Sequence, residues 1–146
     1  MKKLILIGSL CVIFFFPITG VFSHCEIPCG IYDDGMRIKM IREHIATIEK
    51  SMITIQSLEK DKNHNTNQLI RWVMNKEEHA NQLQEIVSQY FMTQRIKPEA
   101  KNYSKELENL HQMLIYSMKC KQTTDLSHVE KLKSLVTAFE ALYFEK

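Results

Sequence analysis

The residues of this chain best suited to chemistry lie close together near its start, at positions 24–32. They read His-Cys-Glu-Ile-Pro-Cys-Gly-Ile-Tyr, so an imidazole and two thiols fall within six residues. If the chain is cut just before His24, a free α-amine joins them. An amine, a deprotonated backbone amide and two thiolates form a planar donor set that suits Ni(II) or Cu(II), whereas Zn(II) prefers a tetrahedron. This stretch is therefore a candidate transition-metal site.

Each part of this stretch can contribute to such a site. Cys25 can offer its thiolate and backbone amide, Cys29 a second thiolate, and His24 its amine and an imidazole outside the plane. Pro28 restricts the backbone before Cys29 and Gly30 permits a turn after it, which favours a compact hook over a helix. The spacing leaves one alternative open, because two exported cysteines this close can also form a small disulfide loop.

The first 23 residues have the pattern of a secretory signal peptide. Lys2 and Lys3 precede a mainly apolar run over residues 4–16, and a cut is predicted after Ser23. The alternative is an uncleaved membrane anchor, which would place Pro17 inside the span. We therefore expect an exported protein, periplasmic or extracellular, with no stable membrane anchor after cleavage.

Charge and cysteine content narrow the choice of partners. The formal charge is +2, and it falls to zero when Lys2 and Lys3 leave with the signal peptide. The basic residues form no stripe, so nucleic acid is not an expected partner. Cys11 lies in the leader, and Cys120 is expected to be a buried helix residue. One close pair of cysteines then remains, which does not amount to a disulfide framework.

The rest of the chain, residues 33–146, is predicted to be all-α, an up-down-up-down four-helix bundle preceded by the irregular hook. Glycine and proline are scarce, and helix-forming residues dominate. The first helix is predicted over residues 35–59, with Asp33 or Asp34 as its N-cap. Its apolar residues recur at steps of three and four, which is typical of one buried helix face: Ile38, Ile41, Ile45, Ile48, Met52 and Ile55.

Three more helices follow from the same periodicity. The second is predicted over residues 66–92, and Lys76 interrupts its apolar stripe of Leu69, Val73, Ala80, Leu83, Val87 and Tyr90. For the third we expect Ser104 as the cap and four inward residues, Leu107, Leu110, Leu114 and Met118. The fourth is predicted to begin with a capping box at Ser127 and Glu130, followed by an inward seam of Leu132, Val136, Phe139 and Tyr143.

The hook sequence resembles the nickel-binding hook of the nickel-containing superoxide dismutases. That family's signature after processing is His-Cys-x-x-Pro-Cys-Gly-x-Tyr. Every fixed position is matched here, directly after a removable leader, by His24, Cys25, Pro28, Cys29, Gly30 and Tyr32. The signal peptide (1–23), nickel hook (24–32) and helical bundle (33–146) then account for the whole chain.

The resemblance implies an enzyme that disproportionates superoxide to O2 and H2O2 with a Ni(II)/Ni(III) centre. It implies that His24, Cys25 and Cys29 bind the nickel ion, with the His24 imidazole as axial ligand. Tyr32 would lie over the open face of the metal and position superoxide or a water molecule. Family members are four-helix bundles assembled as homohexamers, so a homohexamer is the assembly that the resemblance implies.

The sequence also departs from the family. Many members support the axial imidazole with a glutamate in the first helix and an arginine in the second, whereas Lys39 and His79 stand at these positions. Glu43, Glu78 and His79 are candidates to replace that support. The other histidines are expected at the surface: His44, His64, His111 and His128.

Two functions other than the enzyme remain open from the residues alone. One is an exported carrier that binds nickel or copper through the same hook without turnover. The other is a non-catalytic helical bundle with a Cys25–Cys29 disulfide.

Overall fold

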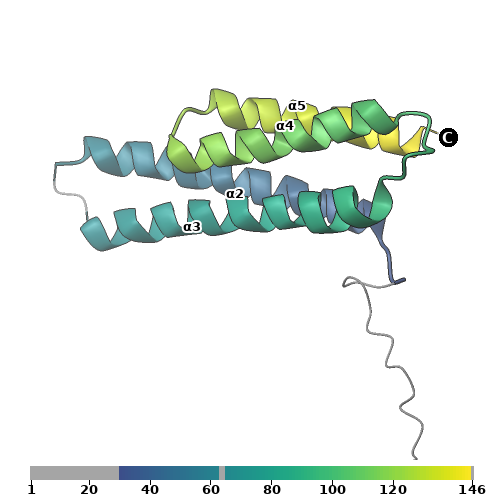
Figure 1. Cartoon of the computed structure of the whole chain (residues 1–146). Coiled ribbons are helices and arrows are strands. Elements are labelled where there is room, and N and C mark those ends of the chain that lie inside the picture. The colour runs from purple at the N-terminus through teal and green to yellow at the C-terminus, as the bar shows by residue number, and fades with distance from the viewer. Residues whose placement is uncertain (1–29, 63–64, 146) are drawn as a thin grey trace, which may run out of the picture.

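A computed structural model describes residues 30–62 and 65–145 of the chain. Over these residues the structure is helical and contains no strand. Its elements are α2 (Asp34–Lys60), α3 (Thr66–Glu85), the π-helix η1 (Ile86–Arg95), α4 (Tyr103–Gln122) and α5 (Ser127–Phe144). Because η1 continues α3, the elements form four rods, and each rod packs against its neighbours in sequence, with α5 closing against α2 (Figure 1). The predicted four-helix bundle is confirmed.

Helix α2 supplies one wall of the core, as its apolar periodicity predicts. Asp33 is its N-cap, because the Asp33 Oδ1 accepts a hydrogen bond of 2.9 Å from the backbone N–H of Met36. The predicted seam is at most 3% exposed along its whole length, at Ile38, Ile41, Ile45, Ile48, Met52 and Ile55. Burial of this seam stabilises the helix, since β-branched isoleucine has only modest helix propensity.

The second rod differs from the prediction in two ways. A regular helix was expected to residue 92, but from Ile86 the backbone takes the π register and continues to Arg95. A π-helix bonds each residue to the fifth one along, which sequence periodicity does not reveal. In addition, Val73 is 39% exposed instead of buried, whereas Lys76 is only 4% exposed. The buried face of α3 therefore runs through Lys76, Ala80 and Leu83.

Helices α4 and α5 close the bundle. In α4 the buried apolar residues are Leu110, Met113 and Cys120, whereas Met118 is 44% exposed and its predicted inward position was wrong. The reason is rotational drift: steps of three and four carry the buried face from Leu110 to Met113, which leaves Leu107 and Leu114 at its half-buried edge. Cys120 is buried as expected, and burial raises the pKa of its thiol to about 11.

The predicted caps of these two helices are wrong. Asn102 and Leu126 occupy the N-cap positions, and neither makes a side-chain capping bond. Instead of a capping box, the Asp125 carboxylate accepts a 2.9 Å hydrogen bond from the backbone N–H of Ser127. The predicted α5 seam is confirmed, with full burial of three residues and a half-buried fourth: Leu132, Val136, Phe139 and Tyr143. None of the helices in the described ranges has the length and apolar run of a membrane span.

Candidate metal centre and its platform

The predicted hook enters the described structure only at its last three residues. His24, Cys25 and Cys29 lie outside the described residues, so their predicted roles as ligands stay predictions. Gly30 has φ +74°, the left-handed conformation that glycine adopts most readily, which agrees with a turn directly after Cys29. The chain then enters α2 at the end of the bundle opposite the α4–α5 connection (Figure 1).

Tyr32 is the one predicted site residue that the structure describes, and its ring contacts the second rod. The guanidinium carbon of Arg95 lies 4.2 Å from the centroid of the Tyr32 ring. The ring of Tyr90 meets the Tyr32 ring edge to face, with centroids 6.0 Å apart and an interplanar angle of 72°. A cation over a ring face and an edge-to-face pair are both attractive arrangements. Tyr32 is nevertheless 42% exposed, so it also reaches solvent.

A carboxylate holds these two partners of Tyr32 in place. Arg95 binds Asp34 in a bidentate pair, Nε to Oδ1 at 2.9 Å and Nη2 to Oδ2 at 2.8 Å. The hydroxyl of Tyr90 donates to Oδ1 at 2.7 Å, and that of Tyr143 donates to Oδ2 at 2.9 Å. These four donors use the acceptor positions of the carboxylate. We call this group of Asp34, Tyr90, Arg95 and Tyr143 the Asp34 cluster.

The cluster shifts the ionisation of its members in directions that favour the ion pair. Burial by itself would raise the pKa of Asp34, but the hydrogen bonds from Arg95, Tyr90 and Tyr143 outweigh it and the pKa is lowered. Burial and the hydrogen bond to Asp34 raise the pKa of Tyr143 to about 12, and the same causes raise the pKa of Tyr90. The hydrogen bond to Asp34 raises the pKa of Arg95. At neutral pH the cluster therefore contains a carboxylate, a guanidinium and two neutral phenols.

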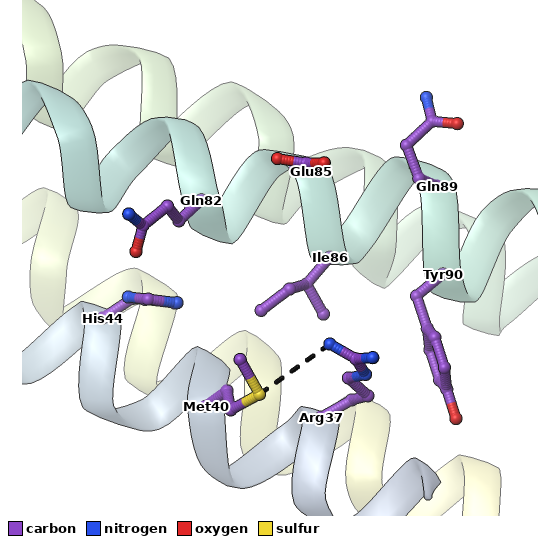
Figure 2. A pocket seen from close by; sticks show the side chains of 8 residues that line it. All are labelled: Arg37, Met40, His44, Gln82, Glu85, Ile86, Gln89 and Tyr90. Atoms are coloured by element: carbon purple, nitrogen blue, oxygen red, sulfur yellow. Dashed lines mark hydrogen bonds between the residues drawn. The ribbon is translucent and has the colours of Figure 1, made fainter. Parts of the chain in front are cut away.

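An open groove of about 350 Å³ extends from this cluster between α2 and the second rod. Figure 2 shows its two walls, with Tyr90 at one end and His44 at the other. The guanidinium carbon of Arg37 lies 5.0 Å from the centroid of the Tyr90 ring, so a second cation stands beside the groove. The lining residues are Arg37, Met40 and His44 on one side, and Gln82, Glu85, Ile86, Gln89 and Tyr90 on the other.

A pair of histidines lies at the far end of the groove. His44 was predicted at the surface, but it is only 9% exposed, and its Nδ1 lies 2.9 Å from the Nδ1 of His79. A hydrogen bond between two such nitrogens needs one N–H and one free lone pair, so the two imidazoles share a single proton at this contact. Burial lowers the pKa of His44 and the neighbouring His79 lowers it further, against the opposing effect of Glu43 and Glu78.

The other two candidates for supporting the axial imidazole lie at the surface. Glu43 and Glu78 are exposed, and Glu78 accepts a 2.6 Å hydrogen bond from Gln82. Lys39, which stands where many members have a glutamate, is also exposed. Of the remaining histidines, His111 is exposed, His64 lies outside the described residues, and His128 is half-buried against the ring of Tyr116.

The donors suited to nickel all precede the described part of the hook. Among residues 30–62 and 65–145, no three His, Cys, Asp or Glu side chains gather into a group that could hold a metal ion. The thiols and imidazole of residues 24–29, with the amine that cleavage before His24 would free, are donor types that would suit a nickel ion.

Comparison with known proteins decides the family. The model of the nickel-containing superoxide dismutases matches residues 19–146, which include the hook and the whole bundle. The chain belongs to this family. It is a nickel-dependent superoxide dismutase, an oxidoreductase with nickel as its cofactor and superoxide as its substrate. Comparison with the curated proteins and with the solved structures gave no match.

In this superoxide dismutase the sequence analysis singled out the hook but did not identify the Asp34 cluster, which holds the ring of Tyr32. Asp34 was considered only as a helix cap, and Arg95 only as the start of a connection. A signal was present, because Tyr90 and Arg95 carry polar groups at the end of a helix whose partner helix starts with an acid. Nothing in the linear spacing of these residues reveals that all three converge on Tyr32.

Proposed function

We propose that His24, Cys25 and Cys29 bind the nickel ion after residues 1–23 are removed, and that Tyr32 lies beside the metal. The observation that carries this proposal is the complete match of the hook signature within the matched region. Further support comes from the described end of the hook. Gly30 turns the chain directly after Cys29, and Tyr32 is attached to the bundle two residues later.

When bound, nickel supplies the one-electron chemistry by which one superoxide is oxidised to O2 and a second, with two protons, is reduced to H2O2. The residues of the chain provide the surroundings for that chemistry. The exposed Tyr32 hydroxyl can hydrogen-bond to superoxide or to a water molecule at the metal and can donate a proton to the reduced product. The His24 imidazole would add a nitrogen donor to the thiolates.

We further propose that the groove and its histidine pair support the hook. His24 precedes the start of α2 by only ten residues in the sequence. The groove extends from Tyr90, which contacts Tyr32, to His44. The His44–His79 pair therefore takes the place of Glu43 and Glu78 as the best candidate to orient the His24 imidazole. Because the pair shares one proton between its Nδ1 atoms, the Nε2 of one neutral imidazole can accept a further hydrogen bond and the Nε2 of the other can donate one.

Adding a single glycine before His24 tests the ligand set. The terminal amine would become an amide, a much weaker donor, so we expect loss of superoxide dismutase activity while the bundle still folds. The readouts are superoxide decay, nickel content and the far-ultraviolet circular dichroism spectrum. A glycine added after Lys146 is the matched control and should leave all three unchanged. Full activity in the N-terminally extended protein would contradict the proposal.

The carrier and disulfide alternatives predict different chemistry for the processed protein. A carrier would bind nickel without fast superoxide decay, and a Cys25–Cys29 disulfide would leave only the Cys120 thiol to titrate in unfolded protein. For the dismutase we expect three titratable thiols in the metal-free, unfolded chain and rapid superoxide decay once nickel is restored. The family match favours the enzyme over both alternatives.

We also propose that the protein is exported and that it assembles as a homohexamer. Export is supported by the signal-peptide pattern of residues 1–23, and the test is an intact mass that begins at His24. Assembly is supported by the family resemblance and by exposed apolar side chains one turn apart on α3, since Ile70 is 53% and Met74 is 65% exposed. Sedimentation equilibrium should give six times the mass of the mature chain, and a monomer would contradict the assembly.

A further inference from the structure

We infer that Arg95 is a positioning residue for the reaction: it holds the ring of Tyr32 at the base of the hook, and the π register of η1 places it there. The inference rests on the proposed role of Tyr32 beside the metal. It concerns residues of the bundle that the hook signature does not include.

The first argument is the contact between Arg95 and Tyr32. The guanidinium lies over the ring face at 4.2 Å, and the edge-to-face contact with Tyr90 restrains the ring from a second direction. Tyr32 follows Cys29 by three residues, and Ile31 between them is 81% exposed. Among residues 30–32, Tyr32 is therefore the one whose side chain is held against the bundle. The orientation of the Tyr32 ring then affects the hook residues immediately before it.

The second argument is that Arg95 itself cannot shift without breaking the Asp34 cluster. Its side chain is 24% exposed and that of Asp34 is 16% exposed, so their bidentate pair is partly screened from water. The planar fork of a guanidinium leaves little freedom once both of its nitrogens are bonded to one carboxylate. Tyr90 and Tyr143 donate to the same carboxylate, which ties η1 and α5 to the start of α2.

The third argument is the register of η1. In an α-helix, residues five apart are rotated by about 140° from each other, so their side chains leave the helix in different directions. In η1 the hydrogen bonds join residues five apart, as from the backbone N–H of Ile96 to the Phe91 carbonyl at 3.0 Å, and the wider turn brings such residues closer to one face. Tyr90 and Arg95 then lie on the same face, and both donate to the Oδ1 of Asp34, at 2.7 and 2.9 Å.

A different role for Arg95, attraction of the superoxide anion by its charge, is less well supported by the geometry. The Arg95 charge is opposed by the Asp34 carboxylate at 2.8 Å, so the pair has little net field at a distance. Arg37 beside Tyr90 has no such bidentate carboxylate partner and is better placed for attraction. Attraction by charge and positioning by planar contact predict different results for a lysine at this position.

The test compares Arg95→Gln and Arg95→Lys in the mature, nickel-loaded protein. We expect Arg95→Gln to keep its nickel and lose about tenfold in kcat/KM, the usual range for a residue one step removed from a metal site. Arg95→Lys should not restore the rate, because an ammonium lacks the planar fork. The salt dependence of kcat/KM should match that of the wild type in both variants, and the electron paramagnetic resonance signal of the oxidised nickel should change shape.

A double-mutant cycle tests whether Arg95 acts through Tyr32. In a Tyr32→Leu background, Arg95→Gln should cause little further loss, because the ring that Arg95 positions is gone. Arg42→Gln is the matched control. It also breaks an ion pair between helices, Arg42 to Glu140 at 2.6 Å, but it lies away from the hook and should leave activity unchanged.

The outcomes separate this inference from the proposed function. Wild-type kcat/KM in Arg95→Gln, full rescue by Arg95→Lys, or additive losses in the cycle would overturn the inference and leave the nickel ligands unaffected. If Arg95→Gln does not fold, Arg95→Lys decides, since it keeps the charge: an activity equal to that of the wild type overturns the inference. A wild-type protein that starts at His24 and binds no nickel would overturn the proposed function and the inference with it.

Discussion

Asp34 and Lys76 are charged residues near opposite ends of the bundle, and the structure compensates their burial in different ways. Asp34 is paired with Arg95, whereas Lys76 has, among the described residues, only Glu77 as an opposite charge, at 3.8 Å. Asp34 is bonded to side chains from η1 and α5, and those of η1, Arg95 and Tyr90, in turn contact the hook residue Tyr32. Lys76, only 4% exposed, donates instead to main-chain carbonyls at the end of α4, at 2.7 Å to Cys120 and 3.3 Å to Thr123. Figure 1 shows the start of α2 at one end of the bundle and the α4–α5 connection at the other.

The two groups therefore differ in role: the Lys76 contacts stabilise the fold, and the Asp34 cluster serves the function. The carbonyls at a helix C-terminus have no partners within the helix, and the Lys76 ammonium satisfies three of them while complementing the negative end of the helix dipole. Burial lowers the pKa of Lys76, because the charged ammonium loses part of its hydration. The Asp34 cluster satisfies no helix end in this way. It joins three segments beneath the one aromatic residue that the hook presents to the bundle.

The strongest test of this separation removes a hook ligand. Cys29→Ser should lose nickel and superoxide dismutase activity entirely, because a serine hydroxyl does not replace a thiolate. The melting temperature of the metal-free protein should not change, since Cys29 precedes the helices that form the core in sequence. Cys120→Ser, a thiol removed from the core, should do the reverse and lower stability while nickel binding persists. Activity in Cys29→Ser would remove the thiolate ligand from the proposal.

Asp34→Asn is expected to affect both function and stability. It leaves the Arg95 guanidinium without its carboxylate, so we expect a loss of about 2 kcal/mol in unfolding free energy, typical of hydrogen bonds to charged groups, and a fall in activity like that of Arg95→Gln. Because the folded pKa of Asp34 is lowered, its contribution is complete above about pH 4 and is lost as pH falls through the folded pKa. Urea unfolding at several pH values should show the two proteins converging in acid.

Lys76→Met should affect stability alone. The substitution keeps an apolar stem of similar length but leaves carbonyls at the end of α4 unpaired, so we expect a loss of about 1–3 kcal/mol. The specific activity per bound nickel should equal that of the wild type. Lys119→Met, a change of the same kind on the half-buried surface of α4, is the matched control. A Lys76→Met protein with impaired turnover would break the division between the two ends.

The smallest expected effect is on stability and concerns the His44–His79 pair, which belongs neither to the Asp34 cluster nor to the Lys76 contacts. The folded pKa of His44 is lowered, so the unfolded chain binds more protons, and the stabilisation present above about pH 6.5 is lost as pH falls below it. His44→Gln should flatten the pH dependence of the melting temperature between about pH 5 and 7. His111→Gln, at an exposed position, should not. An unchanged pH profile in His44→Gln would contradict the assigned shift.

Prediction from the sequence worked where a single element determines the outcome. The isoleucine seam of α2 and the Asp33 cap follow from local periodicity and local hydrogen bonding, and both are confirmed. It failed where the partner of a side chain lies on another helix. Lys76 looked like an interruption of a stripe, because its partners are carbonyls about 45 residues away. His44 looked like a surface histidine, because its partner is on another helix.

The sequence by itself determined the chemistry proposed for this protein, since the proposed nickel donors lie within six consecutive residues and would need almost no tertiary structure to come together. It also determined the helical bundle, because periodic burial is written into each helix separately. Only the tertiary structure decided what supports the hook. A π-helical turn in the second rod aligns Tyr90 with Arg95, and the packing of three segments brings both to Asp34 beneath Tyr32. Contacts between distant segments depend on how the helices pack, and no local pattern encodes them.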